Sequence, residues 1–326
     1  MRRRQFIALF GGAAVAWPAV ALGQRGASKT IGWLSPRSAA ETENLVAFRA
    51  GLSQTGYVAG DNLLIEYRWA DGQYERLPAL AADLARNNVA VFVTTGGPQP
   101  ARAAIAASGT TPVVFTSGSD PVKDGLVLSL NKPGGRVTGA VVFTTSLGPK
   151  RLELLRELVP AAQLIAFLVN PRSDIADMQV TEVVRAAEAI GQKLIILNAS
   201  TDREIEDAFE KCRLHGIDAL LMSADLFYQT RREQLVALAQ RHKVPVMWEW
   251  PEFVAAGGLV SYSANRVEIY LQLGIYVGRI LNGTNPADLP VIQSTRFELA
   301  INRQTAKALD LAIPSKLLFT ADTVIE

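Results

Sequence analysis

Small hydroxyl residues and a glycine follow an apolar run in the first half of the chain. The run Val113-Val114-Phe115 is typical of a buried strand, and the residues TSGS at 116–119 follow it directly. Hydroxyl and backbone N–H groups at such a turn suit three kinds of chemistry. They could form a catalytic nucleophile turn, a phosphate cradle or a cup for a ligand that does not react.

The sequence lacks the partners that catalysis would require. Neither Ser117 nor Ser119 lies in a Gly-x-Ser-x-Gly frame, and the two histidines, His215 and His242, are isolated at the ends of predicted helices. Two such histidines and one cysteine do not make an ordinary zinc site. The chain also lacks the Gly-x-x-x-x-Gly-Lys-Ser/Thr loop and the dinucleotide glycine fingerprint. We therefore predict no catalytic residue, no metal site and no cofactor.

Turns that follow predicted strands supply the candidate ligand-binding residues. Small residues let the backbone approach a ligand closely, and hydroxyls with free N–H groups favour a carboxylate. Asp225 would either pair with a ligand ammonium group or cap the next helix, and the aromatic residues would either sandwich a flat ligand or pack in the core. The predicted ligand-binding residues are Ser35, Thr95, Gly96, Gly97, Thr116, Ser117, Asn170, Asp225, Trp248 and Tyr262.

Strand-like and helical patterns alternate along almost the whole chain, and these elements must position the turns. A first series ends near residue 143, and a second, which includes a helical pattern over 228–241, starts near Pro149. Two such series predict an α/β protein with two open, doubly wound parallel sheets, each covered by helices on both faces. Ligands bind beyond the carboxyl ends of the strands in such sheets, so two facing lobes would form a cleft there.

The N-terminal residues have the composition of an export signal. A basic start precedes an apolar run over 8–22, which ends in a small-x-small pattern. We predict a signal over residues 1–23 that is cleaved near Gly23 and Gln24, and hence a periplasmic protein. The residues RRQFI at 3–7 resemble the twin-arginine consensus, with a general secretory signal or a membrane anchor as the alternatives.

Composition limits the partners and the redox chemistry of the chain. The formal net charge is +2 and the basic residues are scattered, so no nucleic acid or other polyanion is expected as a partner. Cys212 is the only cysteine, which excludes an internal disulfide. Because Cys212 continues a helical apolar pattern that includes Ile205 and Phe209, we predict a buried structural thiol.

Several blocks of the sequence resemble one bacterial family, the ABC transporter substrate-binding proteins related to tryptophan/tyrosine-binding receptors. The blocks are SGSDP at 117–121, GLV at 125–127, KPGG at 132–135, VTG at 137–139, LNAST at 197–201, EFVAAGGL at 252–259, YVGRILNG at 276–283, FELAIN at 297–302 and TAKAL at 305–309. They cover nearly all of the chain after the signal. Asp310 stands where members of this family commonly have glycine, which alters only a helix cap.

The resemblance implies the type I periplasmic-binding fold, in which a three-crossover hinge joins two lobes. On this basis we expect the first lobe to comprise residues 28–143 with 256–283, and the second to comprise 144–255 with 284–326. The implied function is capture of a small amino acid-like or aromatic carboxylate by hinge closure, for an ABC importer. The implied partners are a small-molecule ligand and the ABC permease with its ATPase subunit at the inner membrane, and the protein would be a monomer.

Similar receptors for amino acids hold the ligand carboxylate with hydroxyl and N–H groups of the first lobe, and the ammonium with an acid of the second. Thr95, Ser117 and Asp225 stand in suitable turns for these roles. Two other functions stay open. One is an exported, cofactor-dependent enzyme, because twin-arginine cargo often carries a cofactor. The other is a receptor that presents its ligand to a signalling partner.

Overall fold

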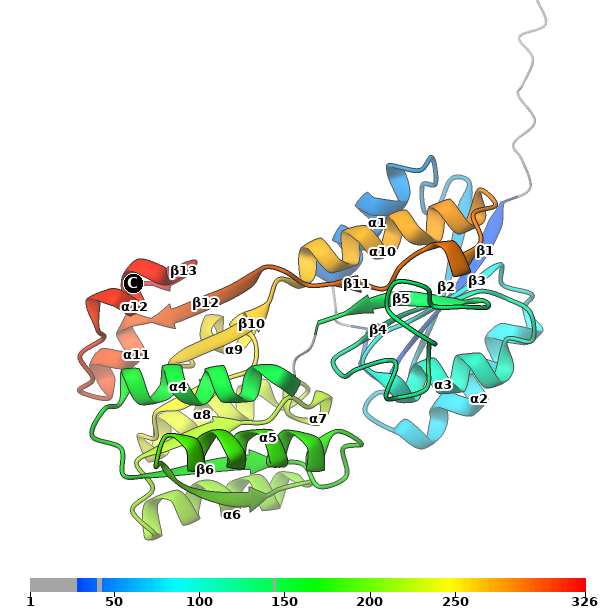
Figure 1. The fold of residues 1–326 in the computed structure, drawn as a ribbon. Coiled ribbons are helices and arrows are strands. Elements are labelled where there is room, and N and C mark those ends of the chain that lie inside the picture. The colour runs from blue at the N-terminus through cyan, green and yellow to red at the C-terminus, as the bar shows by residue number, and fades with distance from the viewer. Residues whose placement is uncertain (1–27, 40–42, 143–144) are drawn as a thin grey trace, which may run out of the picture.

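The computed structural model of the chain describes residues 28–39, 43–142 and 145–326. The predicted signal over 1–23 and its cleavage point lie outside these residues. The described chain forms two lobes, each built on one β-sheet with helices on both faces (Figure 1). The prediction of an α/β protein with two doubly wound lobes is confirmed. No helix in the described ranges is long and apolar enough to cross a membrane.

The first lobe is built on a six-stranded sheet in which every strand pair is parallel. Residues in its central strands are buried on both faces, and this explains the continuous apolar run that opens at Val113. In spatial order the strands are β11 (Ile292–Gln293), β5 (Val137–Val141), β4 (Val113–Ser117), β3 (Val91–Thr94), β1 (Lys29–Ser35) and β2 (Leu63–Trp69).

Helices cover both faces of the first sheet (Figure 1). On one face lie α1 (Glu43–Ser53) and α10 (Arg266–Leu281), and on the other α2 (Leu77–Arg86) and α3 (Pro98–Ala107). Glycines let α1 and α10 pack closely, because a Cβ on Gly51 would lie 1.9 Å from the Leu271 carbonyl oxygen, and one on Gly274 would lie 2.1 Å from a carbonyl oxygen of α1. This packing fixes the orientation of α10, whose first turns reach the site described below.

The second lobe is built on a seven-stranded sheet with one antiparallel pair. In spatial order its strands are β13 (Thr323–Ile325), β12 (Phe297–Asn302), β10 (Val260–Ala264), β9 (Val246–Trp248), β8 (Ala219–Met222), β6 (Leu164–Val169) and β7 (Lys193–Asn198). The sheet is otherwise parallel, and the antiparallel pair is β10 with β12, where Tyr262 lies opposite Leu299. The reason is that β10 leaves this lobe and β12 returns from the other one, so the two run in opposite directions.

Two groups of helices enclose the second sheet. One face carries α6 (Asp202–Leu214), α8 (Arg232–His242) and α9 (Pro251–Ala255), and the other carries α4 (Gly148–Leu158), α5 (Ala176–Ala189), α11 (Arg303–Ala308) and α12 (Ser315–Thr320). A one-turn helix, α7 (Leu226–Gln229), stands between β8 and α8. It lies beyond the carboxyl end of β8, and therefore at the edge of the sheet where a ligand is expected.

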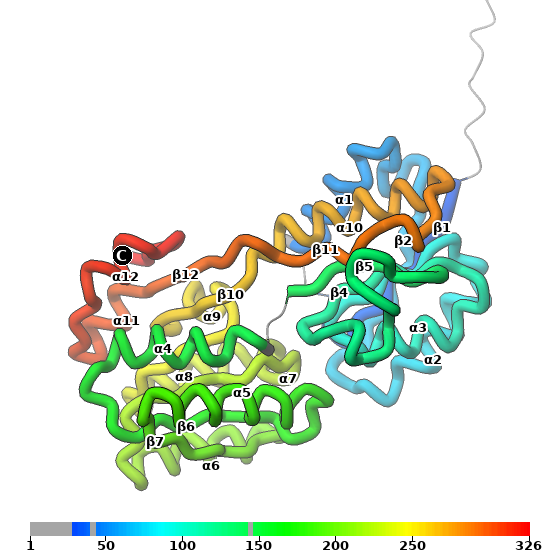
Figure 2. Tube along the Cα trace, in the orientation of Figure 1, coloured from blue at the N-terminus to red at the C-terminus, as the bar shows by residue number. Residues whose placement is uncertain are grey.

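Three connections join the lobes, as the type I fold requires. The first leads from β5 to a 3₁₀ turn at Thr145–Leu147, the second from β10 to α10, and the third from β11 to β12. Figure 2 shows the second and third running side by side, and the Asn265 N–H donates to the Arg296 carbonyl between them at 2.9 Å.

The strand pairing differs from the lobe boundaries that we expected. The expected boundaries placed 256–283 in the first lobe, but β10 pairs in the second sheet. They placed 284–326 in the second lobe, but β11 pairs with β5 in the first sheet. The second crossing therefore follows Ala264, and the third lies between Gln293 and Phe297. Apolar periodicity identifies a strand but carries no information about which of two similar sheets it joins.

Candidate ligand-binding site

A cleft lies between the two lobes, beyond the carboxyl ends of their strands. It holds about 810 Å³ of space, part of it open to solvent. The first lobe contributes the turns after β1, β3 and β4 together with the start of α10, and the second contributes the turns after β6, β8 and β9. Because side chains of both lobes line the same space, a molecule in the cleft would contact both.

Five of the predicted residues line this cleft, namely Gly96, Gly97, Thr116, Ser117 and Asp225. Gly96 and Gly97 have φ angles of +91° and +113°, which residues with a Cβ rarely adopt. The turn between β3 and α3 therefore depends on glycine at both positions. It brings the backbone to the cleft wall without a side chain in the way.

Three other predicted residues lie behind the lining and support it. The Ser35 hydroxyl accepts a hydrogen bond from the Arg37 N–H at 3.2 Å, and Arg37 lines the cleft. The Asn170 amide donates to Asp225 at 2.9 Å. Thr95 is fully buried, and its N–H donates to the Leu34 carbonyl at 3.1 Å.

The two predicted aromatic residues lie outside the lining of the cleft. Trp248 is fully buried in the core of the second lobe, where its ring stacks on Phe253 with centroids 4.7 Å apart. Tyr262 stacks on Phe297 at 6.0 Å, and both residues belong to the antiparallel pair of strands. Both aromatic side chains therefore pack within the protein, which is the second of the two roles that the sequence allowed for them, rather than sandwiching a ligand.

The wall from the first lobe combines two serine hydroxyls with the start of a helix. The Ser117 and Ser119 hydroxyls lie 3.1 Å apart, and Ser119 donates its N–H to Ser117 at 3.2 Å and its hydroxyl proton to Asp124. Beside them Gly97 precedes the ten-residue helix α3, whose first turn also lines the cleft. N–H groups in a first helical turn have no intrahelical acceptor and carry a partial positive charge. Pro98 and Pro100 have no N–H, so Gln99 is the residue between them that supplies one in this turn. This wall is therefore suited to a carboxylate or a similar anion.

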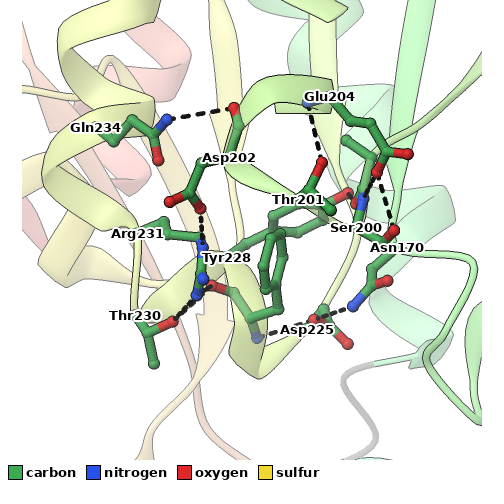
Figure 3. Close-up of polar contacts among 12 residues, drawn as sticks. Asn170, Ser200, Thr201, Asp202, Glu204, Asp225, Tyr228, Thr230, Arg231 and Gln234 are labelled. Atoms are coloured by element: carbon green, nitrogen blue, oxygen red, sulfur yellow. Dashed lines mark hydrogen bonds and ion pairs between the residues drawn. The ribbon is translucent and has the colours of Figure 1, made fainter. Parts of the chain in front are cut away.

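Asp225 both caps α7 and lines the cleft, so the two roles that the sequence allowed are compatible. Its Oδ1 accepts from the Phe227 N–H and from the Asn170 amide, each at 2.9 Å (Figure 3). Burial raises the pKa of Asp225, and hydrogen bonds from Asn170, Ser173 and Phe227 oppose that rise.

Two contacts hold α7 against α6 and β7 (Figure 3). The Tyr228 hydroxyl donates to the Ala199 carbonyl at 2.8 Å, and Arg231 forms an ion pair with Asp202 in the first turn of α6. Burial raises the pKa of Tyr228, so its hydroxyl stays a neutral donor. These contacts fix the position from which α7 presents Asp225 and Gln229 to the cleft.

A buried acid that we did not predict, Glu249, lines the cleft directly after β9. Only 5% of Glu249 is exposed, and burial raises the pKa of its carboxyl to about 7, against the opposing charge of Arg151. Arg151 on α4 is 1% exposed, and its Nε donates to the Tyr262 carbonyl at 2.7 Å. Burial lowers the pKa of Arg151 to about 10, so the guanidinium stays charged near neutral pH.

Arginine and aromatic side chains that we also did not predict complete the lining. Arg37, Tyr74, Trp250, Arg266 and Tyr270 all face the cleft. The Arg266 guanidinium lies 4.0 Å from the centre of the Trp250 ring and forms an ion pair with Glu252. The members of this group come from four parts of the chain, after β1, after β2, after β9 and from α10, and the fold brings them together.

The two lobes also touch at the cleft. Arg102 on α3 reaches Asp174 of the second lobe at 3.7 Å and Asp124 of its own lobe at 3.8 Å. A Cβ on Gly96 would lie 2.9 Å from Leu226 Cδ1, so Leu226 of the second lobe packs against the first. In the part of the chain that the structure describes, no group of three or more His, Cys, Asp or Glu side chains could hold a metal ion.

Comparison with known proteins gives a consistent result. A family model described as ABC transporter substrate binding protein matches residues 39–325. A curated relative, the tyrosine-binding protein of Clostridioides difficile (strain R20291), is 27% identical over 264 residues, which are 81% of this chain and 75% of that protein.

Two solved structures share the fold. A conserved domain protein from Vibrio cholerae superposes with a TM-score of 0.81 at 26% identity, over 91% of this chain and 99% of that one. An ABC domain from Streptococcus pneumonia, solved in complex with L-Trp, superposes with a TM-score of 0.80 at 24% identity, over 91% of this chain and 100% of that one.

Proposed function

The chain belongs to the family of ABC transporter substrate binding proteins, and from this premise we propose that it captures a small amino acid-like or aromatic carboxylate ligand for an ABC importer. The observation that carries the proposal is the cleft, which both sheets line at the carboxyl ends of their strands with polar and aromatic groups. The ligand would be bound there and released unchanged.

The chemistry of the two walls supports this ligand class. The Ser117 hydroxyl and the Gln99 N–H in the first turn of α3 offer donors to a carboxylate, and acids of the second lobe offer acceptors to an amino group. Tyr74, Trp250 and Tyr270 supply flat apolar surface for an aromatic body. The names of the relatives agree with it, since one is a tyrosine-binding protein and another was solved with L-Trp.

Closure of the lobes around the ligand follows from the two-sided lining. A ligand that touches both walls binds the closed form better than the open one, and so shifts the population toward closure. The contacts of Leu226 with Gly96, and of Arg102 with Asp174, are ones that closure would form. We further propose that the protein is a periplasmic monomer, exported by its N-terminal signal, and that its closed form docks on a permease whose ATPase subunit drives import.

A thermal-shift screen of the purified protein tests the proposal. The panel contains amino acids, aromatic acids, nucleosides, sugars and divalent metal ions, and hits are confirmed by isothermal titration calorimetry. We expect stabilisation by aromatic amino acids or related carboxylates. Stabilisation by sugars or metal ions alone would overturn the proposed ligand class.

Variants of the lining connect binding to this cleft. Ser117→Ala and Asp225→Ala should each weaken binding. Asp225→Ala should also lower the free energy of unfolding by about 1 kcal/mol, because it removes the cap of α7. Ser53→Ala, on the exposed side of α1, is the matched control and should bind as the unmodified chain does. Normal binding by both cleft variants would refute the site.

A further inference from the structure

We propose that Gln179 is a positioning residue for ligand capture, which holds two turns of the second lobe together as one wall that closes against the first lobe. The inference rests on the function proposed above, and it concerns a side chain that lies behind the cleft rather than in it. Gln179 stands near the start of α5 and is 3% exposed. It is a polar side chain on the buried face of α5, whose other buried residues are apolar.

The Gln179 amide pairs with both backbone groups of one residue, Ala224. The Ala224 N–H donates to Gln179 Oε1 at 2.7 Å, and Gln179 Nε2 donates to the Ala224 carbonyl at 3.0 Å. A backbone N–H only donates and a carbonyl only accepts, so this pair fixes the orientation of the amide. Among the described residues, the backbone groups of Ala224 have no other hydrogen-bond partner. Gln179 therefore supplies the pairing that a neighbouring strand supplies within a sheet.

The need for such a partner arises where β8 ends. Within the sheet β8 pairs with β6, and the Ser223 N–H still donates to the Leu168 carbonyl at 3.0 Å. One residue later the chain has left the sheet on its way to α7, yet Ala224 is buried, with 3% exposed. A buried N–H or C=O group without a partner destabilises the fold. The Gln179 amide removes that penalty, and so it fixes where the turn after β8 lies.

Gln179 connects the two turns of the second lobe that reach the first lobe. The turn before α5 carries Asp174, which pairs with Arg102 at 3.7 Å. The turn after β8 leads to Leu226, which packs against Gly96. Because Gln179 joins the start of α5 to the second turn, the two contacts with the first lobe belong to one unit. Such a wall closes on a ligand without first ordering two loose turns, and ordering them would reduce the affinity.

Three variants of the full protein test the inference, with L-tryptophan as the probe in isothermal titration calorimetry. Gln179→Met keeps the approximate length of the side chain but removes both hydrogen bonds to Ala224. Gln192→Met is the matched control, because Gln192 is also a buried glutamine of the second lobe. Its amide donates to the backbone carbonyls of Gln163 at 3.0 Å and Lys193 at 3.2 Å, at the amino ends of β6 and β7, away from the cleft. The third variant is Gln179→Glu.

Both methionine variants should lose stability, but only one should lose affinity. Each removes hydrogen bonds to buried backbone groups, so each should lower the midpoint of thermal unfolding, which circular dichroism measures. Gln179→Met should also bind L-tryptophan about tenfold more weakly, because one buried group that loses its partner in the closed form accounts for a factor of this size. Gln192→Met should bind L-tryptophan as the unmodified chain does. An equal loss of affinity in both variants, or no loss in Gln179→Met, overturns the positioning role.

Gln179→Glu adds a pH profile to the test. A protonated glutamic acid has an O–H donor and a carbonyl acceptor, so it can form both bonds to Ala224, whereas the ionised form cannot donate. Burial and the adjacent carboxylate of Asp225 should raise the pKa of this new carboxyl. Relative to the unmodified chain at the same pH, the affinity of Gln179→Glu for L-tryptophan should therefore recover as pH falls from 8 to 5. The relative affinity of Gln179→Met should stay constant over this range.

The outcomes separate this inference from the proposed function. Normal L-tryptophan binding by Gln179→Met, or a relative affinity of Gln179→Glu that does not change with pH, overturns the role of Gln179 and leaves the receptor function standing. If Gln179→Met does not fold, the pH profile of Gln179→Glu decides the question alone. Failure of the unmodified chain to bind L-tryptophan or any other aromatic amino acid or carboxylate of the screen overturns the proposed ligand class, and the inference falls with it.

Discussion

Substitution of Gly96 by alanine tests whether the lobes touch as the structure shows. Gly96 and Gly97 are adjacent and both have positive φ, so alanine strains the backbone at either position. Their surroundings differ. A Cβ on Gly96 would lie 2.8 Å from Pro36 Cγ and 2.9 Å from Leu226 Cδ1, whereas a Cβ on Gly97 would have no atom within 4 Å. Gly97→Ala is therefore a control with the strain but without the collision.

The expected losses of unfolding free energy follow from the backbone strain and from the collision. A residue held in a sparsely populated backbone region costs about 1–3 kcal/mol, and both variants carry that cost. Forcing a methyl group into a filled space costs about 1–3 kcal/mol more, and only Gly96→Ala carries this second cost. We expect Gly96→Ala to lose about 2–6 kcal/mol of unfolding free energy, and Gly97→Ala about 1–3 kcal/mol.

Urea unfolding followed by circular dichroism measures both losses, and Leu226→Ala identifies the inter-lobe part. Because Leu226 belongs to the second lobe, its truncation should relieve some of the collision in the double variant Gly96→Ala/Leu226→Ala. We expect a coupling on the order of 1 kcal/mol between the two substitutions. Equal losses for the two glycine variants would refute the collision, and zero coupling with Leu226→Ala would refute the contact between lobes.

Two further predictions concern the rim of the cleft and the core of the second lobe. The first combines Arg102→Gln and Asp174→Asn in a double-mutant cycle, and we expect a coupling of about 0.2–1 kcal/mol in the free energy of L-tryptophan binding. The coupling should shrink in 1 M NaCl, because both side chains are about half exposed and salt screens their charges. A coupling that salt leaves unchanged would argue against a screened ion pair. The second concerns Cys212, which should not react with Ellman's reagent at pH 8 until the protein unfolds. The reason is that the thiol is buried and that burial raises its pKa to about 11. Labelling of the folded protein would contradict that burial.

Most of the fold could be predicted from the sequence because its signals are local. Fully buried parallel strands require continuous apolar runs, and amphipathic helices separate them along the chain. Features that depend on distant residues were missed. The pattern over 228–241 predicted one helix, but the chain breaks at Thr230 and Arg231 into α7 and α8. The hydrogen bond from Tyr228 to Ala199 and the ion pair of Arg231 with Asp202 hold α7 in its own direction, and neither partner is close in sequence.

The sequence does not show at which residue a strand ends, and this limited the prediction of the site. Successive side chains of a strand point to opposite sides, so a shift of one residue exchanges core and cleft. The sequence indicated Trp248, but Trp248 ends β9 inside the core and Glu249 is the first residue to face the cleft. The same shift separates buried Thr95 from Gly96 on the lining. Arg37 and Arg266 each stand two residues after a strand, β1 and β10, so the same rule reaches them, but the prediction favoured small, hydroxyl and aromatic residues in such turns.

The division of chemistry between the walls gives a physical reason for closure to depend on the ligand. The first lobe offers the Ser117 hydroxyl and the Gln99 N–H at the start of α3, which are donors, while the second lobe offers Asp225 and Glu249, which are acceptors. Either wall alone satisfies one end of a zwitterion and leaves the other in water. A molecule that bears only one charge makes no ionic contact with one of the walls. When the lobes close, the buried polar groups of that wall lose water without gaining a partner, which costs about 1–3 kcal/mol of binding free energy for each group. Discrimination therefore arises in the closed state, so a ligand that lacks either charged group should fail to close the lobes even where it binds one wall.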